Sequence, residues 1–252
     1  MMHPKIWTED FPVRLHDLDA GGNLSLLSIC NFLQSAASNH ARALGVALKH
    51  LQSSGHTWVL AQLKIHMDDY PKQDTLVQIH TWPAGTDRLY ALREFRIQDG
   101  DGRLYGRAGS AWLIIDVERR RPVRVETFGM AIHQTSRNDD ISASIRKLPA
   151  PGRPTFTREF QVRYRDMDVN QHVNNVSYVE WAVESLPATI LMRRALRELE
   201  VNFLGEAHLG DRVVSQAQPL DDSGAAFVHQ IIRFDSEESL VRAKTIWAEG
   251  AF

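Results

Sequence analysis

Residues 165–175 read Arg-Asp-Met-Asp-Val-Asn-Gln-His-Val-Asn-Asn, a polar cluster between a strand-like run that ends at Tyr164 and a helical pattern that starts at Val176. Asp and Asn favour turns and helix N-caps for local reasons, so the cluster could be only a capped turn. A functional site is the alternative, because the helix that follows offers free N–H donors. Two further features favour a functional site. The chain contains a second copy of this segment that lacks the histidine, and a glutamate that could act with it, Glu206, occurs later in the chain.

The polar cluster belongs to one of two related copies. Placing Phe11 opposite Phe160 brings identical residues into register: Val13/Val162, Arg14/Arg163, Asp17/Asp166, Asp19/Asp168 and Ser28/Ser177. Two later blocks follow in the same order: Asp74–Val77 opposite Asp211–Val214, and Arg107–Trp112 opposite Arg242–Trp247. Three matched blocks in one order indicate an internal duplication. We therefore expect an N-terminal domain over 1–148, a proline-rich linker over 149–154 and a C-terminal domain over 155–252.

Each half shows a short strand, the polar junction, one helix and then several strands. Helices are predicted from Leu26 to Leu44, with Gly45 as the stop, and from Val176 onward, with an interruption at Pro187. Strands are predicted over 58–67, 75–82, 89–97, 107–116, 197–203, 212–218, 227–234 and 240–247. One helix followed by consecutive strands predicts an α+β unit, in which an antiparallel sheet wraps the helix.

Composition excludes several classes of function. The chain has 29 Lys and Arg against 31 Asp and Glu, which gives no support for nucleic-acid binding. Cys30 is the only cysteine, which fits a reducing compartment. No apolar run approaches the ~18–20 residues of a membrane span, and the N-terminus lacks a signal-peptide core. No zinc or dinucleotide motif has suitable spacing. We expect a cytoplasmic protein without metal or cofactor, which binds neither nucleic acid nor membrane.

Residues 166–176 resemble the signature of the fatty acyl-acyl carrier protein (acyl-ACP) thioesterases of plant and bacterial type. Further residues fit that family's pattern: Tyr178, Trp181, Glu184, Ser185 and Pro187 in the second half, and Tyr70, Pro71, Asp74, Thr75, Thr81, Trp82, Ala108 and 110–112 in the first. The resemblance implies a tandem (double) hotdog fold, with two helix-wrapped antiparallel sheets forming an internal pseudo-dimer. It also implies an enzyme of fatty acid biosynthesis that hydrolyses the thioester of a fatty acyl chain on acyl carrier protein.

The two copies differ where chemistry is expected. Asn170 and His172 stand opposite Gly21 and Asn23, so only the C-terminal half offers an imidazole. This asymmetry predicts one chemical site per chain, with the first half as scaffold and acyl pocket. Thioester hydrolysis needs an activated water or a nucleophile, a proton carrier and an oxyanion stabiliser. A histidine side chain, with an unperturbed pKa of about 6.5, suits the proton carrier at neutral pH.

Other roles are assigned as follows. Asn170 could bind the carbonyl oxygen or orient a water, and Asp168 could orient its neighbours or act as a base. The helix opening at Val173, Asn174 and Asn175 directs N–H groups at developing negative charge. The resemblance matches Glu206 to the family's catalytic glutamate, which activates water, with His208 as a rival. The predicted catalytic set is Asp168, Asn170, His172 and Glu206.

A cysteine nucleophile is not expected. Plant members commonly carry cysteine directly after the glutamate, where this chain has Ala207, and Cys30 falls on an apolar helical stripe. Attack by water, with Glu206 or Asp168 as base, is favoured over a cysteine route. An acyl-enzyme anhydride on a carboxylate stays open as an alternative.

Substrate contacts are less sharply indicated. Pocket-lining candidates are Phe32, Trp58, Leu63 and Met67, each equally plausible as core. The arginines Arg119, Arg120, Arg121 and Arg124 form either a solvated turn or a docking patch for acidic carrier protein. An acyl-CoA thioesterase and a non-catalytic acyl-chain or acyl-carrier binding hotdog protein are the rival functions. The sequence leaves acyl chain length and pairing into a homodimer open.

Overall fold

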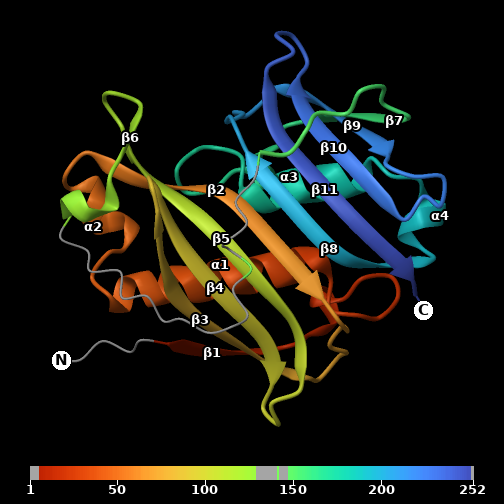
Figure 1. Cartoon of the computed structure of the whole chain (residues 1–252), viewed down its shortest axis with the longest axis horizontal. Coiled ribbons are helices and arrows are strands. Elements are labelled where there is room, and N and C mark those ends of the chain that lie inside the picture. The colour runs from red at the N-terminus through yellow and green to blue at the C-terminus, as the bar shows by residue number, and fades with distance from the viewer. Residues whose placement is uncertain (1–5, 129–140, 142–146, 251–252) are drawn as a thin grey trace. The chain divides into compact units, whose positions relative to one another are not determined.

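The computed structural model describes residues 6–128, 141 and 147–250, and the chain divides into two compact units, residues 1–145 and 146–252 (Figure 1). The elements of the first unit are β1 (Trp7–Pro12), α1 (Leu26–Ala43), α2 (Leu48–Gln52), β2 (His56–Met67), β3 (Leu76–Asp87), β4 (Tyr90–Asp99), β5 (Leu104–Asp116) and β6 (Arg121–Val123). Those of the second are β7 (Phe156–Gln161), α3 (Asn175–Glu184), α4 (Ala188–Leu191), β8 (Arg194–Phe203), β9 (Arg212–Pro219), β10 (Ala226–Arg233) and β11 (Ser239–Glu249).

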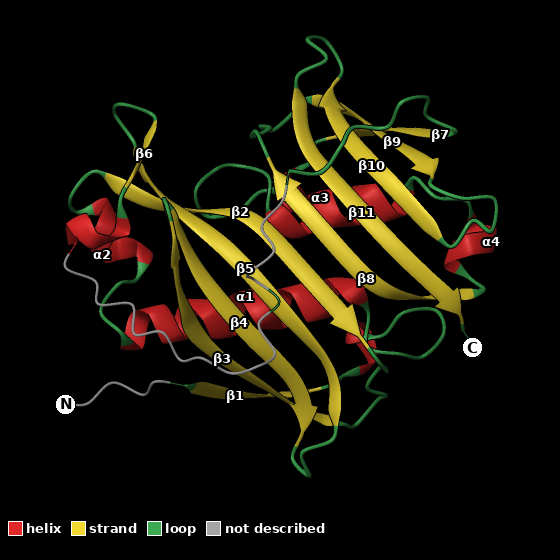
Figure 2. Ribbon diagram, in the orientation of Figure 1, coloured by secondary structure: helices red, strands yellow, loops and turns green. Residues whose placement is uncertain are grey.

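The two units have the same topology. Their antiparallel sheets run β1-β3-β4-β5-β2 in the first unit and β7-β9-β10-β11-β8 in the second. Numbered by appearance, both sheets therefore read first, third, fourth, fifth, second, and each carries one long helix on a face (Figure 2). This shared order confirms the duplication and the α+β class that the sequence predicts.

Strand register corrects one part of the alignment of the two halves. Phe11 pairs with Val77, and its counterpart Phe160 pairs with Val213. Val77 is thus equivalent to Val213, one position away from the predicted match with Val214. The error arose because similar residues repeat along these strands, and only the hydrogen-bond ladder defines the register.

Local signals set the helix ends as expected. Ser25 caps α1 by accepting from the N–H of Ser28, and Gly45, with φ of +74°, follows its last turn. The buried face of α1, which includes Ile29 and Leu33, packs against β1 and β3. α3 ends at Glu184, and Pro187 occupies the N-cap position of α4, so the helix is interrupted at this proline as predicted. Among the described residues, no helix is long and apolar enough to span a membrane.

The four predicted pocket residues make contacts typical of a core. Met67 is fully buried on β2, and Leu63 is nearly so. Trp58 donates its indole N–H to the carbonyl of Val46 at 2.9 Å. Phe32 stacks on Phe11, with 4.5 Å between ring centroids. A role for any of them in an acyl pocket stays a prediction.

Candidate active site

The loop that carries His172 closes on the carboxylate of Asp168. Asp168 Oδ1 accepts from the N–H groups of Asn170 at 2.8 Å and His172 at 3.3 Å, and the Asp168 N–H donates to the His172 carbonyl at 2.8 Å. Gln171 takes a left-handed φ of +63° at the tip. These bonds fix the backbone on which the Asn170 and His172 side chains stand.

The first unit builds the same loop without the imidazole. Asp19 Oδ1 accepts from the N–H groups of Gly21 at 2.9 Å and Asn23 at 3.0 Å, and the Asp19 N–H donates to the Asn23 carbonyl at 2.8 Å. Gly22 takes the left-handed position with φ of +74°. The turn geometry is therefore scaffold, and the site-specific part is the pair of side chains at positions 170 and 172.

A second loop brings Glu206 to His172. It follows β8, and the Val173 N–H donates to the Ala207 carbonyl at 3.1 Å, which joins the two loops. His172 Nε2 lies 3.5 Å from Glu206 Oε2. Their side chains are 38% and 49% exposed, so a substrate can reach both from solvent. The ring of His208 lies 5.3 Å from that of His172, centroid to centroid.

The two candidate carboxylates have different surroundings. Asp168 Oδ2 accepts from the side-chain amide of Asn170 at 3.2 Å, while its other oxygen accepts the two backbone N–H groups. Asp168 is thereby used to orient Asn170 and the loop. Glu206 instead faces the imidazole of His172, which makes it the better placed carboxylate to take a proton from water.

Two side chains, the buried Tyr178 and the partly exposed Arg233, hold the Glu206 loop. The Ala207 N–H donates to the Tyr178 hydroxyl at 2.8 Å. Burial raises the pKa of Tyr178, and the negative charge of Glu206 raises it further, so the hydroxyl stays protonated. Arg233 donates to the Glu206 carbonyl at 2.6 Å and forms an ion pair with Asp211. Sequence reasoning noted Tyr178 only as part of a helix and missed Arg233, for which no local motif exists.

Two of the three predicted oxyanion donors are already used. The Val173 N–H donates to Ala207, and the Asn174 N–H donates to the Asp166 carbonyl at 2.8 Å. The prediction for these two N–H groups was therefore wrong, because the loop needs them for its own closure. The side chain of Asn174 caps α3 by accepting from Val176 at 3.0 Å. Asn175, the first residue of α3, stays a predicted donor.

The other candidates belong to the first unit. Arg119, Arg120, Arg121 and Arg124 are all exposed, at the end of β5 and around β6 (Figure 1). Cys30 is buried on α1, and burial raises the pKa of its thiol to about 12, which disfavours a thiolate nucleophile. In the described part of the chain, no cluster of three or more His, Cys, Asp or Glu could hold a metal ion.

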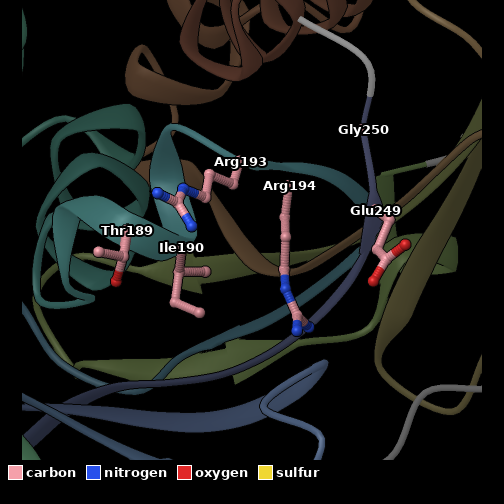
Figure 3. A pocket seen from close by; sticks show the side chains of 6 residues that line it. All are labelled: Thr189, Ile190, Arg193, Arg194, Glu249 and Gly250. Atoms are coloured by element: carbon pink, nitrogen blue, oxygen red, sulfur yellow. The ribbon is translucent and has the colours of Figure 1, made fainter.

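A pocket of about 460 Å³ in the second unit is separate from the predicted site. Its lining residues are Thr189, Ile190, Arg193, Arg194, Glu249 and Gly250 (Figure 3). The guanidinium of Arg194 donates to the carbonyls of Gly224 at 2.7 Å and Ser223 at 2.9 Å. Since those bonds already occupy Arg194, the pocket offers no support for a ligand role.

The fold and site define a tandem hotdog protein with a candidate hydrolytic site in its C-terminal unit. Family models for the acyl-ACP thioesterase N-terminal domain and the acyl-ACP thioesterase C-terminal domain match residues 4–131 and 151–249. The chain belongs to the acyl-ACP thioesterase family.

Known proteins agree with this assignment. The chain is 25% identical over 258 residues to the chloroplastic palmitoyl-acyl carrier protein thioesterase of Cuphea hookeriana, across 96% of this chain and 62% of that protein. The chain thus spans about three fifths of that relative's length. A solved acyl-ACP thioesterase from Bacteroides thetaiotaomicron superposes with a TM-score of 0.87 at 26% identity, covering 97% of this chain and 98% of that one. The 12:0-ACP thioesterase from Umbellularia californica, at 20% identity, shows the same fold with a TM-score of 0.87, covering 99% and 100%.

Proposed function

We propose that this protein hydrolyses the thioester of an acyl-acyl carrier protein and releases a free fatty acid. The observation that carries the proposal is the 3.5 Å approach of His172 Nε2 to Glu206 Oε2, within the unit that matches the family's C-terminal domain. In the described part of the first unit, the position equivalent to His172 is Asn23, whose side chain accepts a hydrogen bond from Lys72 Nζ at 2.6 Å and offers no imidazole.

The geometry supports attack by water. Glu206 accepts a proton from a water molecule as the oxygen of that water bonds to the thioester carbon. The second amide hydrogen of Asn170 and the N–H of Asn175 stabilise the oxyanion that forms. When the carbon–sulfur bond breaks, protonated His172 gives its proton to the leaving sulfur. Glu206 then returns the proton it took to His172, which lies within 3.5 Å. One water and one thioester are thereby converted into one carboxylic acid and one thiol.

Direct attack by Glu206 is the competing route and would form an anhydride on its carboxylate. Label found in Glu206 after a single turnover in isotopically labelled water would demonstrate the anhydride route. Attack by water puts the label into the fatty acid alone, whereas hydrolysis of an anhydride at its enzyme carbonyl leaves the label in Glu206.

The function is tested with a panel of acyl-ACPs and acyl-CoAs of graded length. We expect faster turnover of acyl-ACP, and a loss of about 10²- to 10⁴-fold in kcat for Glu206→Gln, which keeps the side-chain shape. Glu118→Gln is the matched control, because Glu118 is exposed beyond β5 in the first unit. Faster turnover of acyl-CoA would support the rival thioesterase. Binding of acyl chains without turnover would support the non-catalytic module.

A further inference from the structure

We propose that Tyr178 is a positioning residue, which holds Glu206 in reach of His172 through the peptide of Ala207. The inference rests on the hydrolytic function proposed above. Its basis is the hydrogen bond of 2.8 Å from the Ala207 N–H to the Tyr178 hydroxyl. Tyr178 touches neither reacting atom in this scheme, so its effect would pass through the backbone.

The first unit provides an internal comparison for this bond. The Val173 N–H donates to Ala207, and the equivalent Leu24 N–H donates to the Pro71 carbonyl at 2.8 Å. Neighbouring bonds support the same equivalence, from Val13 to Thr75 and from Val162 to Asp211, each at 2.9 Å. Pro71 is therefore equivalent to Ala207, and in each unit the carbonyl at this position joins the two loops.

The N–H side of that peptide differs between the units. Pro71 has no N–H to donate. The residue equivalent to Tyr178 is Ile29, which follows Ser28 as Tyr178 follows Ser177, and Ile29 has no hydroxyl to accept. The fold is thus built once without this hydrogen bond. Its presence in the unit that carries His172 and Glu206 points to the site rather than to the fold.

Tyr178 is itself rigidly placed. Its side chain is buried, and its ring meets that of Trp181 edge to face, with 5.4 Å between centroids. In the Glu206 loop, the side chains of Leu204 and Leu209 are exposed, so side-chain packing contributes less there and backbone hydrogen bonds hold the loop. The fixed hydroxyl of Tyr178 restricts the orientation of the Ala207 peptide. Small displacements of a catalytic group lower the rate of reaction, so loss of this hydrogen bond should lower kcat.

Tyr178→Phe removes the hydroxyl and keeps the ring. We expect kcat on acyl-ACP to fall about 10- to 100-fold with KM nearly unchanged, because binding does not involve this bond. Tyr164→Phe is the matched control, since Tyr164 is 85% exposed and should leave kcat unchanged. An unchanged kcat in Tyr178→Phe would overturn the proposal.

A double-mutant cycle tests the route of the effect. Ala207→Pro removes the N–H donor and reproduces the residue found at Pro71. If Tyr178 acts through that N–H, adding Tyr178→Phe to Ala207→Pro should lower kcat no further. Equal losses in the two backgrounds would mean that the hydroxyl acts elsewhere, and would overturn the proposal.

Amide hydrogen exchange provides a readout that does not depend on turnover. In Tyr178→Phe, the Ala207 amide loses its acceptor, and we expect it to exchange on the order of tenfold faster. Unchanged exchange would contradict the anchor. If the unsubstituted protein hydrolyses no acyl-ACP or acyl-CoA, the proposed function fails, while the exchange result still decides whether Tyr178 holds this loop.

Discussion

The N–H of Val173 donates to the carbonyl of Ala207 at 3.1 Å, across two loops that lie far apart in the sequence. Each partner is the direct neighbour of a candidate catalytic residue, His172 on one side and Glu206 on the other. The backbone therefore sets the approach of the two side chains, which are both partly exposed. This arrangement explains how a solvent-accessible pair can keep a defined geometry.

Replacing His172 by asparagine would give the second unit the residue of the first. We expect His172→Asn to lower kcat about 10²- to 10⁴-fold, because the proton carrier is lost. Thermal stability should change little, since Asn23 occupies the same loop geometry in the first unit. Turnover and melting temperature measure the two effects. A larger loss of kcat in His208→Asn than in His172→Asn would reverse the roles of these residues.

The two loop aspartates allow a matched comparison. Asp168→Asn would keep one side-chain oxygen to accept from the backbone N–H groups. Its other side-chain atom would be an amide nitrogen, which cannot accept the hydrogen bond that the side-chain amide of Asn170 donates to Asp168 Oδ2. We expect about a tenfold loss of kcat, because Asn170 loses its orientation. Asp19→Asn makes the same change in the first unit and should leave kcat unaltered. Equal kcat in the two variants would show that Asp168 only shapes its loop.

His229 predicts how stability depends on pH. It is fully buried, its Nε2 lies 2.8 Å from Thr245 Oγ1, and burial lowers its pKa from 6.5 to about 4. Below pH 6.5 the imidazole of His229 is protonated in the unfolded chain, whereas in the folded protein it stays neutral down to about pH 4. Stability should therefore fall as pH decreases through this window, by about 3 kcal/mol in total.

Urea unfolding between pH 7.5 and 4 measures that fall. His229→Phe should flatten it, and phenylalanine is the residue at the equivalent position of the first sheet, where Phe95 pairs with Ala108 as His229 pairs with Ala243. The same pH dependence in the variant would assign the titration to other groups.

The exposed arginines around β6 predict carrier-dependent binding. If this surface docks an acidic carrier protein, Arg120→Glu should raise KM for acyl-ACP about 3- to 10-fold, with a smaller effect at high salt. KM for acyl-CoA should stay nearly constant. Arg153→Glu, at another exposed position, is the control for a general change of charge. Equal effects of the two variants would remove the docking assignment.

Sequence periodicity and capping residues predicted the long helices and most strands of this fold, but the strand-like run expected to end at Tyr164 is β7, which ends at Gln161, and β6 was not predicted. α1 ends at Ala43, one residue before the predicted end, and α3 begins at Asn175, one residue before the predicted start. These signals are local, because a helix face or a cap involves residues a few positions apart. α2 was not predicted, since its five residues are too few to show a helical period.

The sequence by itself determined the duplication, the α+β class and the difference between His172 and Asn23, because all three are readable from residue types along the chain. Only the tertiary structure decided that Glu206 lies beside His172. The same holds for the N–H groups of Val173 and Asn174, which close the loop, and for the hydrogen bond from the Ala207 N–H to the Tyr178 hydroxyl. The reason is physical. These contacts join segments whose relative register is set by sheet hydrogen bonds, and a one-residue slip, such as the one between Val213 and Val214, changes every partner.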